Sequence, residues 1–136
     1  MELKELWTYT QVIFAAVGGW LGWFLGGYDG FLYTLIVFVI VDYITGVMLA
    51  IINKELSSDI GARGILKKIL IFILVGLAHI IDTYIIGDGS AIRTAVIFFY
   101  ISNEGISIIE NTSNIGLPIP QKLKDVLAQL NNKGGK

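Results

Sequence analysis

Four long apolar stretches constrain this chain more than any other feature of its sequence. They cover residues 9–27, 31–52, 69–86 and 91–109. A helix rises 1.5 Å per residue, so about 20 residues cross the ~30 Å hydrocarbon core of a bilayer. We therefore predict an all-α membrane protein, with four transmembrane helices in residues 1–116 and a cytoplasmic tail in residues 117–136.

The composition supports a membrane domain and excludes several other classes. The chain is 54% hydrophobic and 15% charged, whereas typical soluble domains carry about 25% charged residues. The net charge is −1, so no basic field favours nucleic acid as a partner. The sequence has no cysteine, which excludes disulfides and thiolate metal sites.

The distribution of lysine and arginine predicts the orientation. A basic loop after the second stretch holds Lys54, Arg63, Lys67 and Lys68, and the C-terminal tail holds Lys122, Lys124, Lys133 and Lys136. The short connections "YDG" and "GDGS" hold none. Because positive residues favour the cytoplasmic side, we expect both termini and the basic loop to be cytoplasmic.

The tail predicts a short amphipathic helix over residues 120–131. Leu123, Val126, Leu127 and Leu130 fall on one helical face, and proline suits a first helical position. Such a helix can lie on the membrane surface or on a partner. It can equally dock on the bundle's own loops.

Polar residues inside the apolar stretches are the main candidates for function. They are Asp42, His79, Asp82, Arg93, Asn103, Glu104, Ser107, Glu110 and Asn111. A charge at the bilayer centre costs about 2.5–3.5 kcal/mol on insertion scales, so each requires a partner or water.

Residue counting from the loops predicts which of these groups meet. Asp42 and His79 lie at similar depth, so we expect them to pair. Asp82 and Arg93 lie near the outer ends of their stretches and form a second expected pair.

A third expected layer lies toward the cytoplasm. Lys67 and Lys68 can extend toward Glu104 or Glu110, because a lysine keeps its charged head near water while its stem lies in lipid. A polar stripe of the fourth stretch comprises Tyr100, Glu104, Ser107 and Asn111, and a partner stripe of the second comprises Asp42, Thr45, Gly46 and Asn53. These stripes can face each other or line water together.

Less specific interpretations of the polar groups remain open. Static interhelical pairs are often worth about 0.6 kcal/mol each. A metal site at Asp42, His79 and Asp82 would need a ligand geometry that one sequence does not show. With one histidine and no nucleophile beside a base, no catalytic site is expected, nor is a cofactor.

The first stretch carries a glycine stripe. Gly18, Gly22 and Gly26 are four residues apart, a spacing that lets helices approach closely in lipid. We expect this stripe to pack either on the second helix of the same chain or on another copy.

Several motifs together resemble the toxin-secretion/phage-lysis holin family. They are "VDYITGVMLAIINKELSSDIGARGILKKI", "SNEGISIIEN" and "GLPIPQKLKDVL", in this order. The resemblance covers the chain from about Val41 to Leu130. It implies a non-enzymatic protein of the bacterial cytoplasmic membrane that forms homo-oligomers and opens lesions. Endolysin or a toxin would be released through them without a specific contact.

Two other functions fit the same residues. A small ion channel or transporter subunit would use the intramembrane charges for its substrate. A non-lytic antiholin, or a scaffold for protein export, would act through the tail helix.

Overall fold

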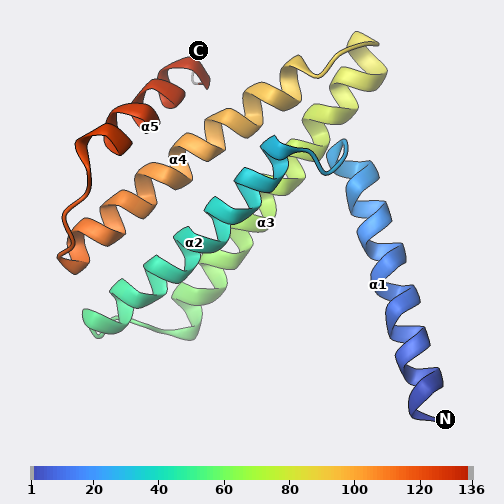
Figure 1. Ribbon diagram of the computed structural model, residues 1–136, viewed down its shortest axis with the longest axis horizontal. Helices are drawn as coiled ribbons and strands as arrows, with labels where there is room; N and C mark the ends of the chain where they lie inside the picture. The colour runs from blue at the N-terminus through green and yellow to red at the C-terminus, as the bar shows by residue number, and fades with distance from the viewer. Residues whose placement is uncertain (1, 135–136) are drawn as a thin grey trace.

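The computed structural model describes residues 2–134, and their side chains to residue 130, as a bundle of helices (Figure 1). The elements are α1 (Leu3–Leu25), α2 (Gly30–Ile52), α3 (Ser58–Ile80), the π-helical segment η1 (Ile81–Ile86), α4 (Ala91–Ile115) and α5 (Gln121–Gly134). The all-α prediction is confirmed. The predicted tail helix is present as α5, and residues 135–136 of the tail lie outside the described part.

The helix ends follow from local sequence chemistry. Gly26 and Gly27 end α1 with φ angles of +86° and +103°, which only glycine adopts without cost. Asp29 caps α2 by accepting a hydrogen bond from the Leu32 amide at 2.9 Å. Ser57 caps α3 in the same way. These signals divide the apolar sequence into separate rods.

The core lies where α2, α3 and α4 meet. Its members are Leu25, Leu32, Leu35, Val39, Ile71, Val75, Ile97 and Ile101, all at most 7% exposed. The most extensive helix pair is α2 with α4, and α5 folds back along α4. The three central helices therefore form the frame that positions the polar groups.

Three helical segments in the described residues are long and apolar enough to cross a membrane. They are Gly30–Ile52, Ser58–Ile86 and Ala91–Ile115. The helix α1 is not among them, so the structure supports three of the four predicted spans. Glycine, threonine, glutamine and aromatic residues dilute its aliphatic content. Figure 1 shows α1 diverging from the other helices.

The contacts of α1 differ from the prediction. Within the described residues, α1 packs on α3 and not on α2. The Phe24 ring occupies the place beside Gly76 that a side chain would otherwise fill. The expected packing of α1 on the second helix is therefore wrong, because the close approach uses a glycine of α3.

The helix α3 begins earlier than the predicted span. Gly61 and Gly64 lie inside this one continuous helix. The Tyr43 ring of α2 packs against both glycines, 3.2 Å from the position of a Cβ on Gly64. Their small size makes room for this ring between α2 and α3.

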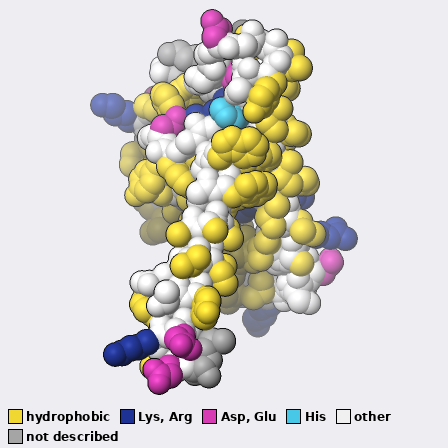
Figure 2. Space-filling model, turned by 90° about the vertical axis from the view of Figure 1, so that its right-hand side faces the viewer, with side chains coloured by type: hydrophobic (Ala, Val, Ile, Leu, Met, Phe, Trp, Pro, Cys, Tyr) yellow, Lys and Arg dark blue, Asp and Glu magenta, His cyan; other side chains and the backbone are white. Residues whose placement is uncertain are grey.

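The surface of the bundle is largely apolar. Many large hydrophobic side chains point outward, including Phe14 at 73% and Ile85 at 77% exposure. On the face in Figure 2, hydrophobic side chains cover much of the middle, and charged ones gather toward the two ends. A bilayer would cover the apolar middle.

Candidate functional site

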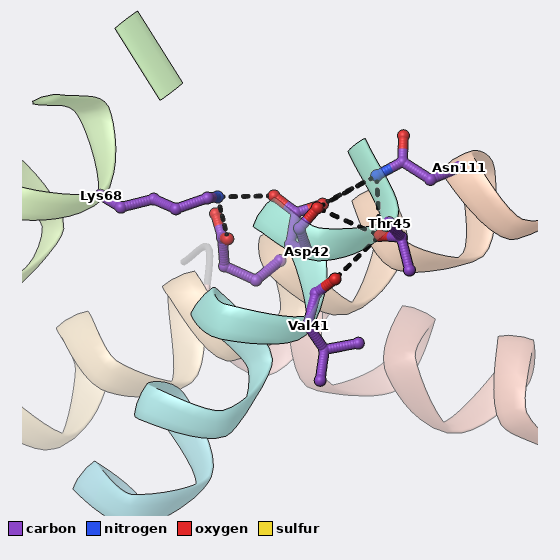
Figure 3. A network of polar contacts seen from close by, with 6 residues as sticks. Val41, Asp42, Thr45, Lys68 and Asn111 are labelled. Carbon is purple, nitrogen blue, oxygen red and sulfur yellow. Dashed lines mark hydrogen bonds and ion pairs between the residues drawn. The ribbon is translucent and has the colours of Figure 1, made fainter. Parts of the chain in front are cut away.

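A lysine from α3 joins two carboxylates from α2 and α4 inside the bundle. The Lys68 Nζ lies 2.6 Å from an Asp42 oxygen and 2.7 Å from a Glu104 oxygen. The three side chains are only 15%, 12% and 11% exposed. The expected approach of Lys68 to Glu104 is confirmed. We call Asp42, Lys68 and Glu104 the charged triad (Figure 3).

Polar neighbours extend the charged triad along α2 and α4. The Asn111 amide donates to an Asp42 carboxylate oxygen at 3.2 Å and to the Thr45 hydroxyl at 3.1 Å (Figure 3). Thr45 in turn donates to main-chain oxygens of α2. Gly46 leaves space beside Asn111. The predicted polar stripes of the second and fourth stretches thus face each other at these positions.

A cavity of about 550 Å³ adjoins the charged triad. The triad lines it together with Ser107 and Asn111. Apolar and basic residues line the rest of it toward the loop between α2 and α3, among them Leu56, Ile60 and Lys67. Polar groups that the helices shelter therefore already border a space large enough for several waters.

The predicted pair of Asp42 and His79 is wrong. The Asp42 carboxylate binds Lys68 and Asn111. The His79 ring lies near the opposite end of the bundle, against Gly26. Residue counting placed these two at similar depth because it omitted the helical turns of α3 before Ile69.

A second polar cluster gathers around Arg93, at 3% exposure. Its guanidinium donates to the main-chain oxygens of Leu25 at 2.6 Å and Gly27 at 2.9 Å. It also binds an Asp29 carboxylate oxygen at 2.7 Å. Arg93 thus fastens α4 to the turn between α1 and α2.

The predicted Asp82–Arg93 pair is correct in location and wrong in chemistry. The Asp82 carboxylate accepts from the main-chain amides of Ile92 at 3.1 Å and Arg93 at 2.9 Å. It therefore caps the start of α4, and the guanidinium turns to Asp29. The hydrogen bond from Arg93 holds the pKa of Asp29 below its ordinary value.

Sequence reasoning missed Asp29. An acidic residue in the short outer turn "YDG", at the level of an arginine early in α4, was the available signal. Tyr43, which contacts α3 glycines, was also missed, and no charge pattern indicates it.

The remaining polar candidates differ in how far they are exposed. Ser107 is half-buried and lines the cavity. Asn103 is half-buried. Glu110 is exposed, so of the two glutamates offered to Lys68, Glu104 is the one it binds.

The glycines of α1 have local roles in this structure. The Tyr28 ring lies over Gly22, and its hydroxyl donates to the Gly18 main-chain oxygen at 2.7 Å. Gly26 has a positive φ and lies against Arg93. Of the stripe, Gly18 has nothing within 4 Å of a Cβ position, as does Gly19 beside it, and these two keep the open surface that the self-association hypothesis requires.

The basic loop divides into exposed residues and one inward lysine. Lys54 adopts a φ of +58° in the turn after α2 and is exposed. Arg63 forms an exposed ion pair with Asp59 at 3.3 Å. Lys67 lies at the cavity mouth, whereas Lys68 enters the triad.

The arrangement brings charged side chains together without the grouping that a metal ion requires. Within residues 2–134, no three histidine, aspartate or glutamate side chains gather to hold a metal ion. The charged triad places three ionisable side chains between three apolar helices, beside a cavity.

Comparison with known proteins identifies relatives over most of the chain. The sequence model of the bacteriophage holin family matches residues 19–132. An uncharacterized 14.9 kDa protein of Clostridium perfringens is 43% identical, over 96% of this chain and 99% of its own length. An uncharacterized protein of Listeria monocytogenes is 42% identical, over 87% and 84% of the two chains.

A phage protein is also among the relatives. A probable holin of Bacillus phage phi105 is 40% identical, over 76% of each chain. No solved structure matches. The family match covers most of the residues, including the charged triad, and several relatives exceed 30% identity. The chain therefore belongs to the bacteriophage holin family.

Proposed function

We propose that this protein is a holin that oligomerises in the bacterial cytoplasmic membrane and opens lesions there. Endolysin, or a toxin in a bacterial setting, would leave the cytoplasm through them as cargo without a specific contact. Family membership and the name of the phage phi105 relative support this function. The bilayer and further copies of the chain are the partners it requires.

The charged triad is the observation that carries the mechanism. A bundle of three apolar helices tolerates ionised groups when they shelter one another. The same groups favour water when the helices separate, and the adjoining cavity gives water a place to start. Clustering that turns these faces toward a shared interior would convert sheltered charges into the lining of a lesion.

The membrane potential can bias this step. One charge that crosses the full field is worth about 2.3 kcal/mol per 100 mV. The triad holds two carboxylates and one ammonium, so its movement through part of the field would couple opening to depolarisation.

The orientation belongs to the same proposal. Lys54 in the loop between α2 and α3, Arg63 near the start of α3 and the lysines of the tail support a cytoplasmic position for these segments, because positive residues favour that side. If α1 crosses the membrane as a fourth span, the N-terminus is cytoplasmic as well. Labelling of cysteines introduced singly at Lys4 and Arg63, from outside intact cells, tests both assignments.

Coexpression with a cytoplasmic endolysin tests the function. We expect abrupt lysis after a delay, and no lysis when either protein is omitted. Asp42→Asn and Glu104→Gln should each shift the time of lysis, because each removes a charge from the triad at nearly constant shape. Normal membrane expression without lysis, or unchanged timing in both variants, would contradict the proposal.

A channel or transporter subunit is the second candidate function, because charged side chains line the cavity. That function predicts reversible, ion-selective conductance without release of folded protein. Leakage of a cytoplasmic reporter enzyme separates the two, since only a holin lesion passes it.

A further inference from the structure

The ring of Tyr43 crosses from α2 to α3 beside the charged triad. Its carbons lie 3.2 and 3.5 Å from where a Cβ on Gly64 would stand, and its hydroxyl lies 3.4 Å from the corresponding point on Gly61. The hydroxyl donates to the Gly61 main-chain oxygen at 3.4 Å, which is longer than the about 2.5–3.0 Å usual between two oxygens. Contact with the two glycines, and not a strong hydrogen bond, therefore holds the ring.

The ring lies between the loop end of the cavity and the charged triad. Gly61, Gly64 and Lys68 are spaced by three and four residues, so they share one face of α3. Ile60 lines the cavity near the start of α3, eight residues or about 12 Å before Lys68. Tyr43 lines the same cavity and contacts the two glycines between these levels. Water that moves along α3 from the loop therefore meets this ring before it meets the triad.

The charged triad stays sheltered although it borders a cavity of about 550 Å³. Its side chains are only 11–15% exposed. Among the described residues that line the cavity, Tyr43 alone is aromatic, so it supplies the largest apolar surface of the wall. The ring is half-buried and its one polar contact is long. It can therefore turn away from α3 without breaking a strong bond.

We propose that Tyr43 is the gate of the charged triad. While its ring covers Gly61 and Gly64, the carboxylates are sheltered; when the ring leaves α3, water reaches them through the gap between α2 and α3. The inference rests on the proposed function, in which the triad becomes wetted, and adds the route of the water and the residue that controls it. Tyr43 is a positioning residue and carries no charge.

Thiol labelling at Ser107 measures access to the cavity, because the natural chain has no cysteine. Ser107 lines the cavity without belonging to the triad, and Ser107→Cys replaces one oxygen with sulfur. A cationic methanethiosulfonate is added to open membrane fragments, where it reaches both sides, so the result does not depend on the orientation. Adding Tyr43→Ala removes a half-buried aromatic ring and should speed labelling about tenfold, which corresponds to about 1.4 kcal/mol.

Matched variants separate the ring from other effects. Tyr43→Phe keeps the ring and removes only the hydroxyl, so Ser107→Cys should label as slowly as with Tyr43. Tyr33→Ala removes a tyrosine of α2 that is 69% exposed and does not line the cavity, and it should leave the rate unchanged. Tyr43→Leu repeats the measurement with a milder change, in case Tyr43→Ala disturbs the fold, and should give an intermediate rate.

A buried serine of the same helix controls for general loosening of the bundle. Ser102 is fully buried and does not line the cavity. Ser102→Cys should therefore stay unreactive, both with Tyr43 and with either smaller residue in its place. Arg63→Cys, at an exposed position of α3, gives the rate of an open site.

The outcomes separate the gate from the holin function. Unchanged labelling of Ser107→Cys in the Tyr43→Ala and Tyr43→Leu chains would overturn the gate, as would labelling as fast as at Arg63→Cys while Tyr43 is present. Equal acceleration at Ser102→Cys would overturn it too, because the whole bundle would then have loosened. Lysis with endolysin, timed on the cysteine-free chain, reports the proposed function independently. Acceleration confined to Ser107→Cys, without lysis, would support the gate and contradict the holin function.

Discussion

Removing the shared lysine of the charged triad should destabilise the protein strongly. In Lys68→Met, the Asp42 and Glu104 carboxylates lose an ammonium at 2.6 and 2.7 Å and are left side by side. Removing one partner of a buried ion pair costs about 3–5 kcal/mol. The triad is part-buried, with side-chain exposures of 11–15%, and it borders a cavity that can hold water. We therefore expect a loss toward the lower end of this range in the free energy of unfolding.

Lys67→Met is the matched control, because the adjacent lysine has the same chemistry and lies at the cavity mouth. Substitutions at such exposed sites usually change stability by at most about 0.5 kcal/mol. Loss of helicity, followed by circular dichroism during titration with a denaturing detergent, compares the two variants. Equal stabilities would refute the inference that the Lys68 ammonium holds the three helices together.

A rescue experiment isolates the charge from the shape. Adding Asp42→Asn and Glu104→Gln to Lys68→Met removes the uncompensated carboxylates. Replacing a whole buried ion-pair set with neutral groups of similar size is often close to neutral, so most of the lost stability should return. If the triple variant is no more stable than Lys68→Met, steric packing and not charge explains the loss.

Three further predictions concern the polar cluster around Arg93 and helix α1. Arg93→Lys should loosen α1, since a compact ammonium lacks the planar fork with which the guanidinium reaches Asp29 and two main-chain oxygens at once. Faster hydrogen exchange in α1 checks this prediction, and unchanged exchange would contradict it. Gly76→Ala should push Phe24 away, whereas Gly18→Ala meets nothing within 4 Å and should be neutral or slightly stabilising; equal melting temperatures would argue against the α1–α3 contact. Because the pKa of Asp29 is lowered in the folded state, this residue contributes stability that is complete above its ordinary pKa of 3.8 and is lost as the pH falls through the lower folded pKa. Asp29→Asn should therefore weaken the decrease in stability at acid pH, and an unchanged decrease would refute the assignment.

The sequence was sufficient to predict that these helices exist, because apolar length and glycine or capping residues determine them locally, but it did not predict where α3 begins. It also led to the Lys68–Glu104 contact, since residue counting placed both groups toward the end of the bundle that carries the basic loop. The pairing of Asp42 with His79 failed because the start of α3 was placed too late. A shift of a few residues moves a side chain by several ångströms along the membrane normal.

The helix on which α1 packs and the acceptors of the Arg93 guanidinium could not be predicted from the sequence. Arg93 binds main-chain oxygens of Leu25 and Gly27, and main-chain acceptors leave no mark in a pattern of residue types. The contact of Phe24 with Gly76 is likewise a matter of shape between helices distant in sequence. Composition could place α1 among apolar helices but not against a particular neighbour.

The tie that Arg93 makes has a consequence for biogenesis. The ribosome makes the turn around Asp29 64 residues before this arginine. Until α4 has been made, the turn between α1 and α2 lacks the Arg93 guanidinium that later binds it. Newly made chains should therefore position α1 only after α4 has been made, and fragments that end before α4 should keep an N-terminal helix that is not held by Arg93.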